Sequence, residues 1–154
     1  MDRITLDGRE ICVPDTGTAS LWDVLDGAGA RVPFGCGTGH CGACTVLIDN
    51  EPAPSCLVPK AAAAGADIST ANTSALRVLA EAMALAGAVQ CGFCSPGIVV
   101  TLSWAIRGAA AHRKALMADD IRDLLTGHLC RCTGYQAIVE AGVRASQLML
   151  GTLG

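Results

Sequence analysis

The chain has 154 residues, 51% of them apolar and 16% charged, with a formal net charge of −3 at pH 7. This length allows one domain or two small ones. The negative charge argues against a nucleic-acid partner, because nucleic-acid-binding proteins present a basic surface. No apolar run reaches the ~20 residues needed to span a membrane, and the N-terminus has no signal-peptide pattern. We therefore expect a cytoplasmic protein with neither membrane nor nucleic acid as a partner.

The first 73 residues have the pattern of a small β-rich unit. Apolar segments at 4–6 and 11–13 flank the turn signal Asp7-Gly8 and predict a hairpin. A short helix is predicted from Ser20 to about Asp26, because its apolar residues share one face. Further strands are predicted over 45–49 and, as shorter segments, near 56–57 and 67–69. Strands around one helix suit a β-grasp unit.

Beyond a linker at 72–74, which ends in Ser74 as a helix cap, the pattern is helical. Helices are predicted over about 75–86, from Ser95, over about 120–125 and from Thr133. Ser95 is expected to cap the second, with Pro96 at its first helical position. This helix is apolar nearly all round, so it should be central and buried. Asp119 is the predicted cap of the third helix, and Thr133 has capping-box spacing with Gln136.

Eight of the nine cysteines form two sets of four. The first set is spaced C-x4-C-x2-C-x11-C and consists of Cys36, Cys41, Cys44 and Cys56. The second is spaced C-x2-C-x35-C-x-C and consists of Cys91, Cys94, Cys130 and Cys132. The first spacing is that of plant-type ferredoxins, and four thiolates are the usual ligands of a [2Fe–2S] cluster. The two sets therefore predict two [2Fe–2S] clusters and a redox relay.

The second set lies in two inter-helix turns that repeat one theme: helix, two cysteines, helix. Cys94 and Cys132 each stand immediately before a predicted helix start. The free N–H groups of those helix ends would face an anionic cluster and favour thiolate ligands. A zinc site made of the same four cysteines is the alternative, although the single-residue gap between Cys130 and Cys132 is unusual for zinc.

Other interpretations of the motifs are weaker. Disulfides are disfavoured without a secretory signal. A G-x-G-x-x-G string at 37–42 is followed by a predicted strand and not by a helix, which argues against a dinucleotide site. His40, His112 and His128 lack the paired Cys/His spacing of a Rieske centre, so His40 and His128 are expected in loops near the clusters. Cys12 is predicted to be a small core residue.

Three groups of residues resemble a known family. They are Gly35-Cys36-Gly37-Thr38-Gly39-His40-Cys41-Gly42-Ala43-Cys44-Thr45-Val46 with Ser55-Cys56-Leu57, then Gln90-Cys91-Gly92-Phe93-Cys94-Ser95-Pro96-Gly97, then Leu129-Cys130-Arg131-Cys132-Thr133-Gly134-Tyr135. Together they resemble the small iron–sulfur subunit of molybdenum hydroxylases, the xanthine dehydrogenase or aldehyde oxidoreductase family. The resemblance covers almost the whole chain.

The resemblance implies an α+β protein, with a β-grasp ferredoxin-like domain at residues 1–73 and a four-helix bundle domain at 74–154. It implies an electron-transfer subunit of an oxidoreductase, without a catalytic centre of its own. Molybdopterin, as the cytosine dinucleotide, would lie in a large partner subunit and FAD in a medium one. Gln90 and Cys132 would approach the pterin. A free-standing two-cluster ferredoxin remains the alternative.

Overall fold

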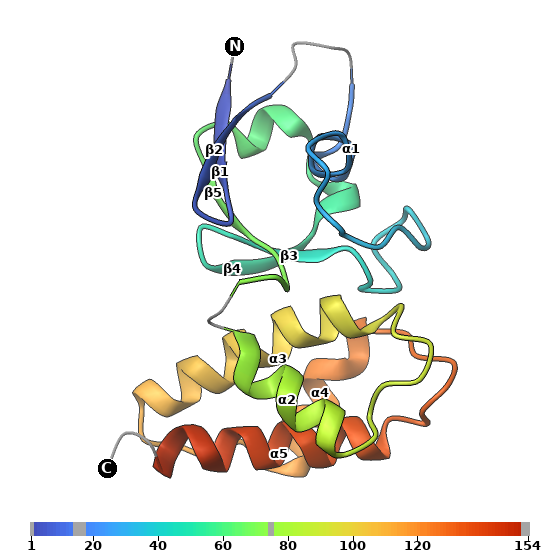
Figure 1. Ribbon diagram of the computed structural model, residues 1–154, viewed down its shortest axis with the longest axis vertical. Helices are drawn as coiled ribbons and strands as arrows, with labels where there is room; N and C mark the ends of the chain where they lie inside the picture. Colours follow the sequence, from blue (N-terminus) through green and yellow to red (C-terminus); the bar gives the residue numbers. More distant parts are fainter. Residues whose placement is uncertain (1, 14–17, 74–75, 152–154) are drawn as a thin grey trace.

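A computed structural model of the protein describes residues 2–13, 18–73 and 76–151. In these ranges the chain forms a mixed five-stranded sheet and five α-helices. Figure 1 shows the sheet with helix α1 in one half of the molecule and the other α-helices in the second half. The predicted cap at Ser74 and the predicted helix start at residue 75 lie outside the described residues.

The sheet has the strand order β2-β1-β5-β3-β4. Its strands are β1 (Arg3–Leu6), β2 (Arg9–Cys12), β3 (Thr45–Ile48), β4 (Glu51–Pro54) and β5 (Asp67–Ser69). Strand β1 pairs antiparallel with β2 and parallel with β5, so the sheet is mixed. The predicted hairpin is confirmed, and its turn residues Asp7 and Gly8 both have positive φ angles, of 47° and 82°. That geometry matches the twist of a two-residue hairpin.

Three details of the first half differ from the sequence prediction. Strand β4 is absent from the sequence prediction. Its Pro52 and Pro54 lack backbone donors, which is tolerated at the edge of the sheet, where β4 pairs with β3 alone. Residues 56–57 form a 3₁₀ helix, η1 (Ser55–Leu57), where a strand was predicted. Cys12 is exposed, which contradicts its prediction as a core residue. As the last residue of edge strand β2, it lies outside the core.

Helix α1 (Leu21–Gly27) begins where the sequence predicts. The Ser20 hydroxyl accepts a hydrogen bond from the Asp23 amide, and the Asp23 carboxylate accepts one from the Ser20 amide at 2.7 Å. This reciprocal capping box fixes the first turn. Leu21 and Leu25 are fully buried against the sheet strands, where they form the first core with Ile4 and Ile68.

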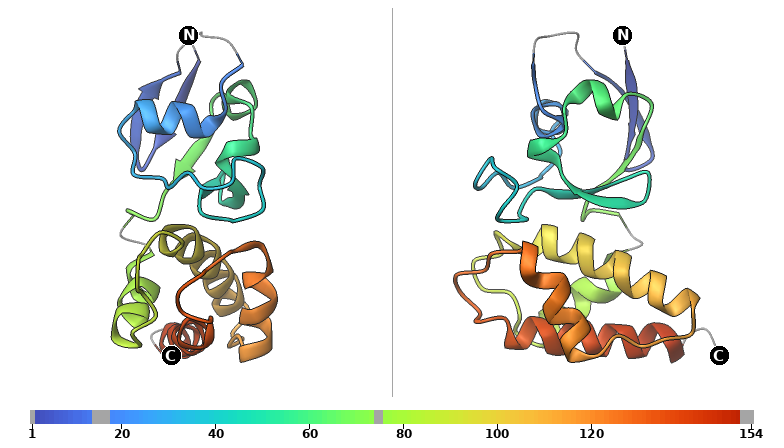
Figure 2. Two further views of the ribbon diagram at one scale, coloured as in Figure 1. Left: turned by 90° about the vertical axis from the view of Figure 1, so that its right-hand side faces the viewer. Right: turned by 180° about the vertical axis from the view of Figure 1, so that it is seen from behind.

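The second half contains α2 (Arg77–Leu85), α3 (Ser95–Ala111), α4 (Ala118–Leu124) and α5 (Gln136–Gly151). As predicted, α3 is central. Its apolar side chains are buried on almost every side, including Ile98, Leu102 and Ile106. Both views in Figure 2 place α3 next to the sheet-containing half. Leu47 of β3 belongs to the same hydrophobic core as the α3 side chains, so the two halves share buried surface.

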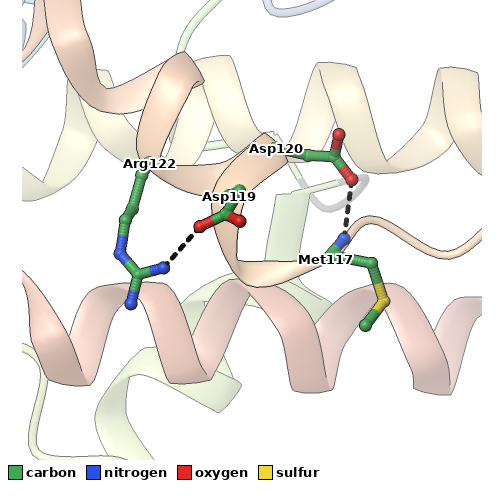
Figure 3. Close-up of polar contacts among 4 residues, drawn as sticks. All are labelled: Met117, Asp119, Asp120 and Arg122. Carbon is green, nitrogen blue, oxygen red and sulfur yellow. Dashed lines mark hydrogen bonds and ion pairs between the residues drawn. The ribbon is translucent and has the colours of Figure 1, made fainter.

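The predicted helix starts in this half are displaced. Cys94 occupies the N-cap of α3, so Ser95 is its first helical residue. Helix α4 begins at Ala118, and the Asp120 carboxylate accepts a hydrogen bond from the Met117 amide at 2.8 Å (Figure 3). Asp119, the predicted cap, instead forms an ion pair with Arg122.

Helix α5 starts at Gln136 and not at Thr133. The Thr133 hydroxyl accepts a hydrogen bond from the Tyr135 amide at 3.2 Å, so it organises the preceding loop. Among the described residues, the helices are too short or too polar for any of them to cross a bilayer.

Candidate metal centres

The cysteines of the two sets lie in loops at the same edge of the molecule. Figure 1 shows the loop before β3 and the loops that precede α3 and α5 projecting to the same side. A cavity of about 320 Å³ lies between them. Its lining includes cysteines of both sets: Cys36, Cys41, Cys91, Cys94, Cys130 and Cys132. The fold therefore brings the predicted ligands of both centres to one interface between the two halves.

In the first set, the thiol of Cys36 is surrounded by backbone donors. Its sulfur accepts hydrogen bonds from the amides of Thr38, His40 and Cys41 at 3.3–3.4 Å. The Cys36 amide in turn donates to the sulfur of Cys41 at 3.4 Å. Amides aimed at sulfur stabilise thiolate charge and tune cluster potentials.

Glycines make this loop possible. A Cβ atom on Gly35 would lie 2.8 Å from the sulfur of Cys41, and one on Gly39 would lie 2.3 Å from a Leu57 methyl carbon. Gly39 also has a φ angle of 77°, in the region that favours glycine. The backbone therefore wraps closely around the sulfurs, as a cluster-binding loop requires.

The other two cysteines of the first set form a second pair. Cys44 is buried immediately before β3, and Cys56 lies in η1. The thiols of Cys44 and Cys56 interact with each other, and the amide of Gly39 interacts with the Cys56 sulfur. Burial and the Cys44 thiol raise the pKa of Cys56 to about 11. The metal-free Cys56 thiol is thus protonated at neutral pH.

The second set is also arranged as two pairs. The thiol of Cys94 interacts with that of Cys130, and both residues are buried. The thiol of Cys91 interacts with that of Cys132, and both residues are exposed. The pairs join the turn before α3 to the turn before α5, so the predicted convergence of the two turns is present.

In each set, one cysteine has a lowered pKa that favours the thiolate form. Hydrogen bonds from the hydroxyl and amide of Thr38 lower the pKa of Cys36 to about 5. Burial raises the pKa of Cys130, but hydrogen bonds from the Thr133 hydroxyl and amide outweigh it and bring the value to about 7. Thiolates are the metal-binding form of cysteine, so these lowered pKa values favour metal binding at both positions.

The donor arrangement fits a binuclear iron–sulfur cluster. Such a cluster uses four thiolates, two on each iron, and both sets present two pairs of cysteines. In the described part of the chain, no three His, Cys, Asp or Glu side chains gather around the position of one ion. That finding concerns a single-ion cage, whereas each iron of a [2Fe–2S] cluster needs only two protein ligands.

Tyr135 holds the second loop, a role that the spacing of the cysteines did not reveal. Its hydroxyl accepts a hydrogen bond from the Cys130 amide at 2.7 Å and donates one to the His128 carbonyl at 2.9 Å. Tyr135 has a φ angle of 69°, which is rare for a residue with a Cβ atom. Only its place in the resemblance motif singled it out.

His40 and His128 lie near the cysteine sets, as the sequence predicts. The His40 amide donates to Cys36, and its ring contacts the Thr38 hydroxyl at 3.1 Å. His128 is buried, and its Nε2 lies 2.8 Å from the Thr101 hydroxyl of α3. Burial lowers the pKa of His128, so its imidazole is neutral at physiological pH. His112 caps the far end of α3.

Sequence comparisons match both halves of the chain. Residues 4–71 match the family described as a 2Fe-2S iron-sulfur cluster binding domain. Residues 66–143 match the family described as a [2Fe-2S] binding domain. The chain is thus an iron–sulfur protein with a binding domain for a [2Fe–2S] cluster in each half.

Individual relatives show which kind of iron–sulfur protein this chain resembles. The chain is 46% identical to the xanthine dehydrogenase iron-sulfur-binding subunit of Escherichia coli O157:H7, covering 71% of this chain and 70% of the relative. It is 44% identical to the caffeine dehydrogenase subunit gamma of Pseudomonas sp. strain CBB1, covering 79% and 73%. The solved structure of quinoline 2-oxidoreductase from Pseudomonas putida 86 matches with a TM-score of 0.80 and 30% identity, covering 96% of this chain and 94% of the other.

This protein belongs to the small iron–sulfur subunits of the molybdenum hydroxylase family, which includes xanthine dehydrogenase and aldehyde oxidoreductase. Its role is electron transfer within an oxidoreductase complex. The relatives are named as subunits, so the free-standing ferredoxin is the less favoured alternative.

Proposed function

We propose that the eight cysteines ligate two [2Fe–2S] clusters, Cys36, Cys41, Cys44 and Cys56 the first and Cys91, Cys94, Cys130 and Cys132 the second. The pairing of thiols within each set supports this assignment. When bound, each cluster supplies one-electron chemistry. The chain contributes ligands, hydrogen bonds to sulfur and a shield from water, and none of its residues acts as an acid, base or nucleophile.

The division into domains follows the two cores. We infer a β-grasp ferredoxin-like domain over 1–73 and a four-helix bundle over 74–154. The sheet and α1 pack around one hydrophobic core, and α2 to α5 pack around another. Each domain would hold one cluster.

The electron donor is proposed to lie beside the second cluster, in a large molybdopterin subunit. The observation that carries this assignment is the exposure of Cys91 and Cys132 as a contacting pair, with exposed Gln90 next to Cys91. An exposed amide beside exposed ligands is suited to a polar cofactor presented by another chain. Gln90 and Cys132 would therefore be the pterin-proximal residues.

The electron acceptor is proposed to face the first cluster, where Cys36, Thr38 and His40 are exposed. An FAD-containing medium subunit is the expected acceptor, and the cytosine dinucleotide form of molybdopterin is the expected cofactor of the donor. Four large apolar side chains near the two sets are 49–66% exposed in the isolated chain: Phe34, Leu57, Phe93 and Leu129. Their exposure is in keeping with burial against partner subunits. The cytoplasmic location stays a prediction.

Purification of the native complex with metal and cofactor analysis tests this function. We expect about four iron per small chain and molybdenum in a larger co-purifying chain. Gln90→Ala should weaken the magnetic interaction between the molybdenum centre and the second cluster, whereas Gln147→Ala, at an exposed position on α5, should not. A small chain that purifies alone, or with about two iron, would contradict the proposal.

A further inference from the structure

The backbones of the two cysteine-bearing regions approach each other closely at Gly42 and Gly97. A Cβ atom built on Gly97 would lie 2.0 Å from the carbonyl oxygen of Gly42 and 3.2 Å from that of Ala43. Ordinary contacts begin at 3.4 Å, and the obstructing atoms are backbone and not the end of a flexible side chain. Both glycines are buried. A single methyl group at position 97 would therefore have to push the two segments apart.

Gly42 is enclosed from a second direction by the loop before α5. A Cβ atom on Gly42 would lie 2.4 Å from the carbonyl oxygen of Gly127 and 2.4 Å from Nδ1 of His128. The His128 ring is itself held by the Thr101 hydroxyl of α3 at 2.8 Å. The Gly42 backbone is thus packed closely between the start of α3 and the loop that leads to Cys130.

The packing of Gly42 against Gly97 connects the segments that carry ligands of the two sets. Gly42 follows Cys41 directly in the chain, and Gly97 lies in the first turn of α3, whose N-cap is Cys94. Helix formation alone does not require glycine at position 97, because alanine favours a helix interior by ~1 kcal/mol. The close approach to Gly42 is what accounts for a residue without a side chain.

We propose that Gly42 and Gly97 are positioning residues that fix the separation of the two clusters and hence the electronic coupling between them. The inference rests on the proposed ligand sets. The step that it controls moves one electron, which oxidises the second cluster and reduces the first, with no proton transferred and no bond broken. Electron tunnelling weakens steeply with distance, so a displaced Gly42 segment would slow this step.

The test is Gly97→Ala in the purified complex, with Gly108→Ala as its control. Gly108 lies in the same helix, but a Cβ atom there would meet nothing within 4 Å. The readout is the magnetic coupling between the two reduced clusters, measured by low-temperature electron paramagnetic resonance, together with iron content. Gly97→Ala should retain both clusters and lose part of the coupling, while Gly108→Ala should match the wild type. Unchanged coupling in Gly97→Ala would overturn the inference.

If Gly97→Ala does not fold, a variant with a smaller structural perturbation tests the same inference. Thr101→Val removes only the hydroxyl that holds His128 against Gly42, and it should reduce the coupling in the same direction by a smaller amount. Wild-type coupling in Thr101→Val would then overturn the inference. Failure of the proposed function looks different: the unmodified complex would lack one of the two cluster signals, and no coupling would exist to perturb.

Discussion

The backbone amide of Leu129 donates a hydrogen bond to the carbonyl oxygen of Cys41 at 2.9 Å. Cys41 belongs to the first ligand set, and Leu129 precedes Cys130 of the second. One hydrogen bond and a few covalent bonds therefore connect the two sets. The contact spans the interface between the sheet-containing and helical halves, so the same bond that joins the ligand loops also helps to hold the halves together.

Replacing one ligand should remove one cluster only. In Cys94→Ser, we expect iron to fall from about four to about two per chain, because a [2Fe–2S] cluster needs four thiolates. The matched control is Cys12→Ser, since Cys12 is exposed and lies outside both sets. Iron analysis with visible absorption checks the result. Loss of both clusters from Cys94→Ser, or of either from Cys12→Ser, would argue against independent ligand sets.

Thr38 should govern the ionisation of Cys36. The pKa of this thiol is about 5 in the metal-free chain, chiefly because the Thr38 hydroxyl stabilises the thiolate. Between that value and the ordinary value of 9.0, wild-type Cys36 is a thiolate, and in Thr38→Val the thiolate should appear only at higher pH. Alkylation of Cys36 against pH, followed by peptide mass spectrometry, gives the midpoint. Thr38→Ser should restore the low midpoint, and an unmoved midpoint in Thr38→Val is incompatible with this role.

Tyr135→Phe should loosen the second ligand loop. The change leaves the Cys130 amide and the His128 carbonyl without their partner, and an unsatisfied buried polar group costs about 1–3 kcal/mol. We expect a lower urea midpoint and a shifted reduction potential of the second cluster, with the first cluster unaffected. If the variant moves neither quantity, the hydroxyl does not organise the loop.

The core of the helical half should be sensitive to truncation. Ile138 on α5 is fully buried, and removing such a side chain to alanine costs ~2–5 kcal/mol. Leu148→Ala on the same helix is the control, because Leu148 is 52% exposed. Urea unfolding of the metal-loaded chain compares the two. Equal stability of both variants would place Ile138 outside the core.

Local sequence patterns predicted the elements that are held by local interactions. The hairpin turn at Asp7-Gly8, the helix α1 and the buried α3 each have their signal within a few residues. Strand β4 lacked such a signal, since its prolines disfavour pairing and only the neighbouring strand β3 defines it. The starts of α4 and α5 differ from the prediction because the polar residues there serve other contacts: Asp119 pairs with Arg122, and Thr133 accepts a hydrogen bond from the Tyr135 amide.

The candidate site likewise combines features that the local sequence predicts with features that depend on tertiary packing. Cysteine spacing alone predicted the two ligand sets, because the chemistry of a cluster restricts that spacing strongly. The contact of Gly42 with Gly97 and the bond of Leu129 to Cys41 join residues distant in the chain. Such contacts depend on how the two halves pack, and no periodicity or motif in either segment encodes them.

The most direct test of the central claim is electron paramagnetic resonance of the fully reduced protein at low temperature. Two ligand sets in different environments should give two distinguishable [2Fe–2S] signals of equal intensity, each integrating to about one spin per chain. A single signal, or a colourless protein without any, would contradict the account of this chain as a two-cluster relay.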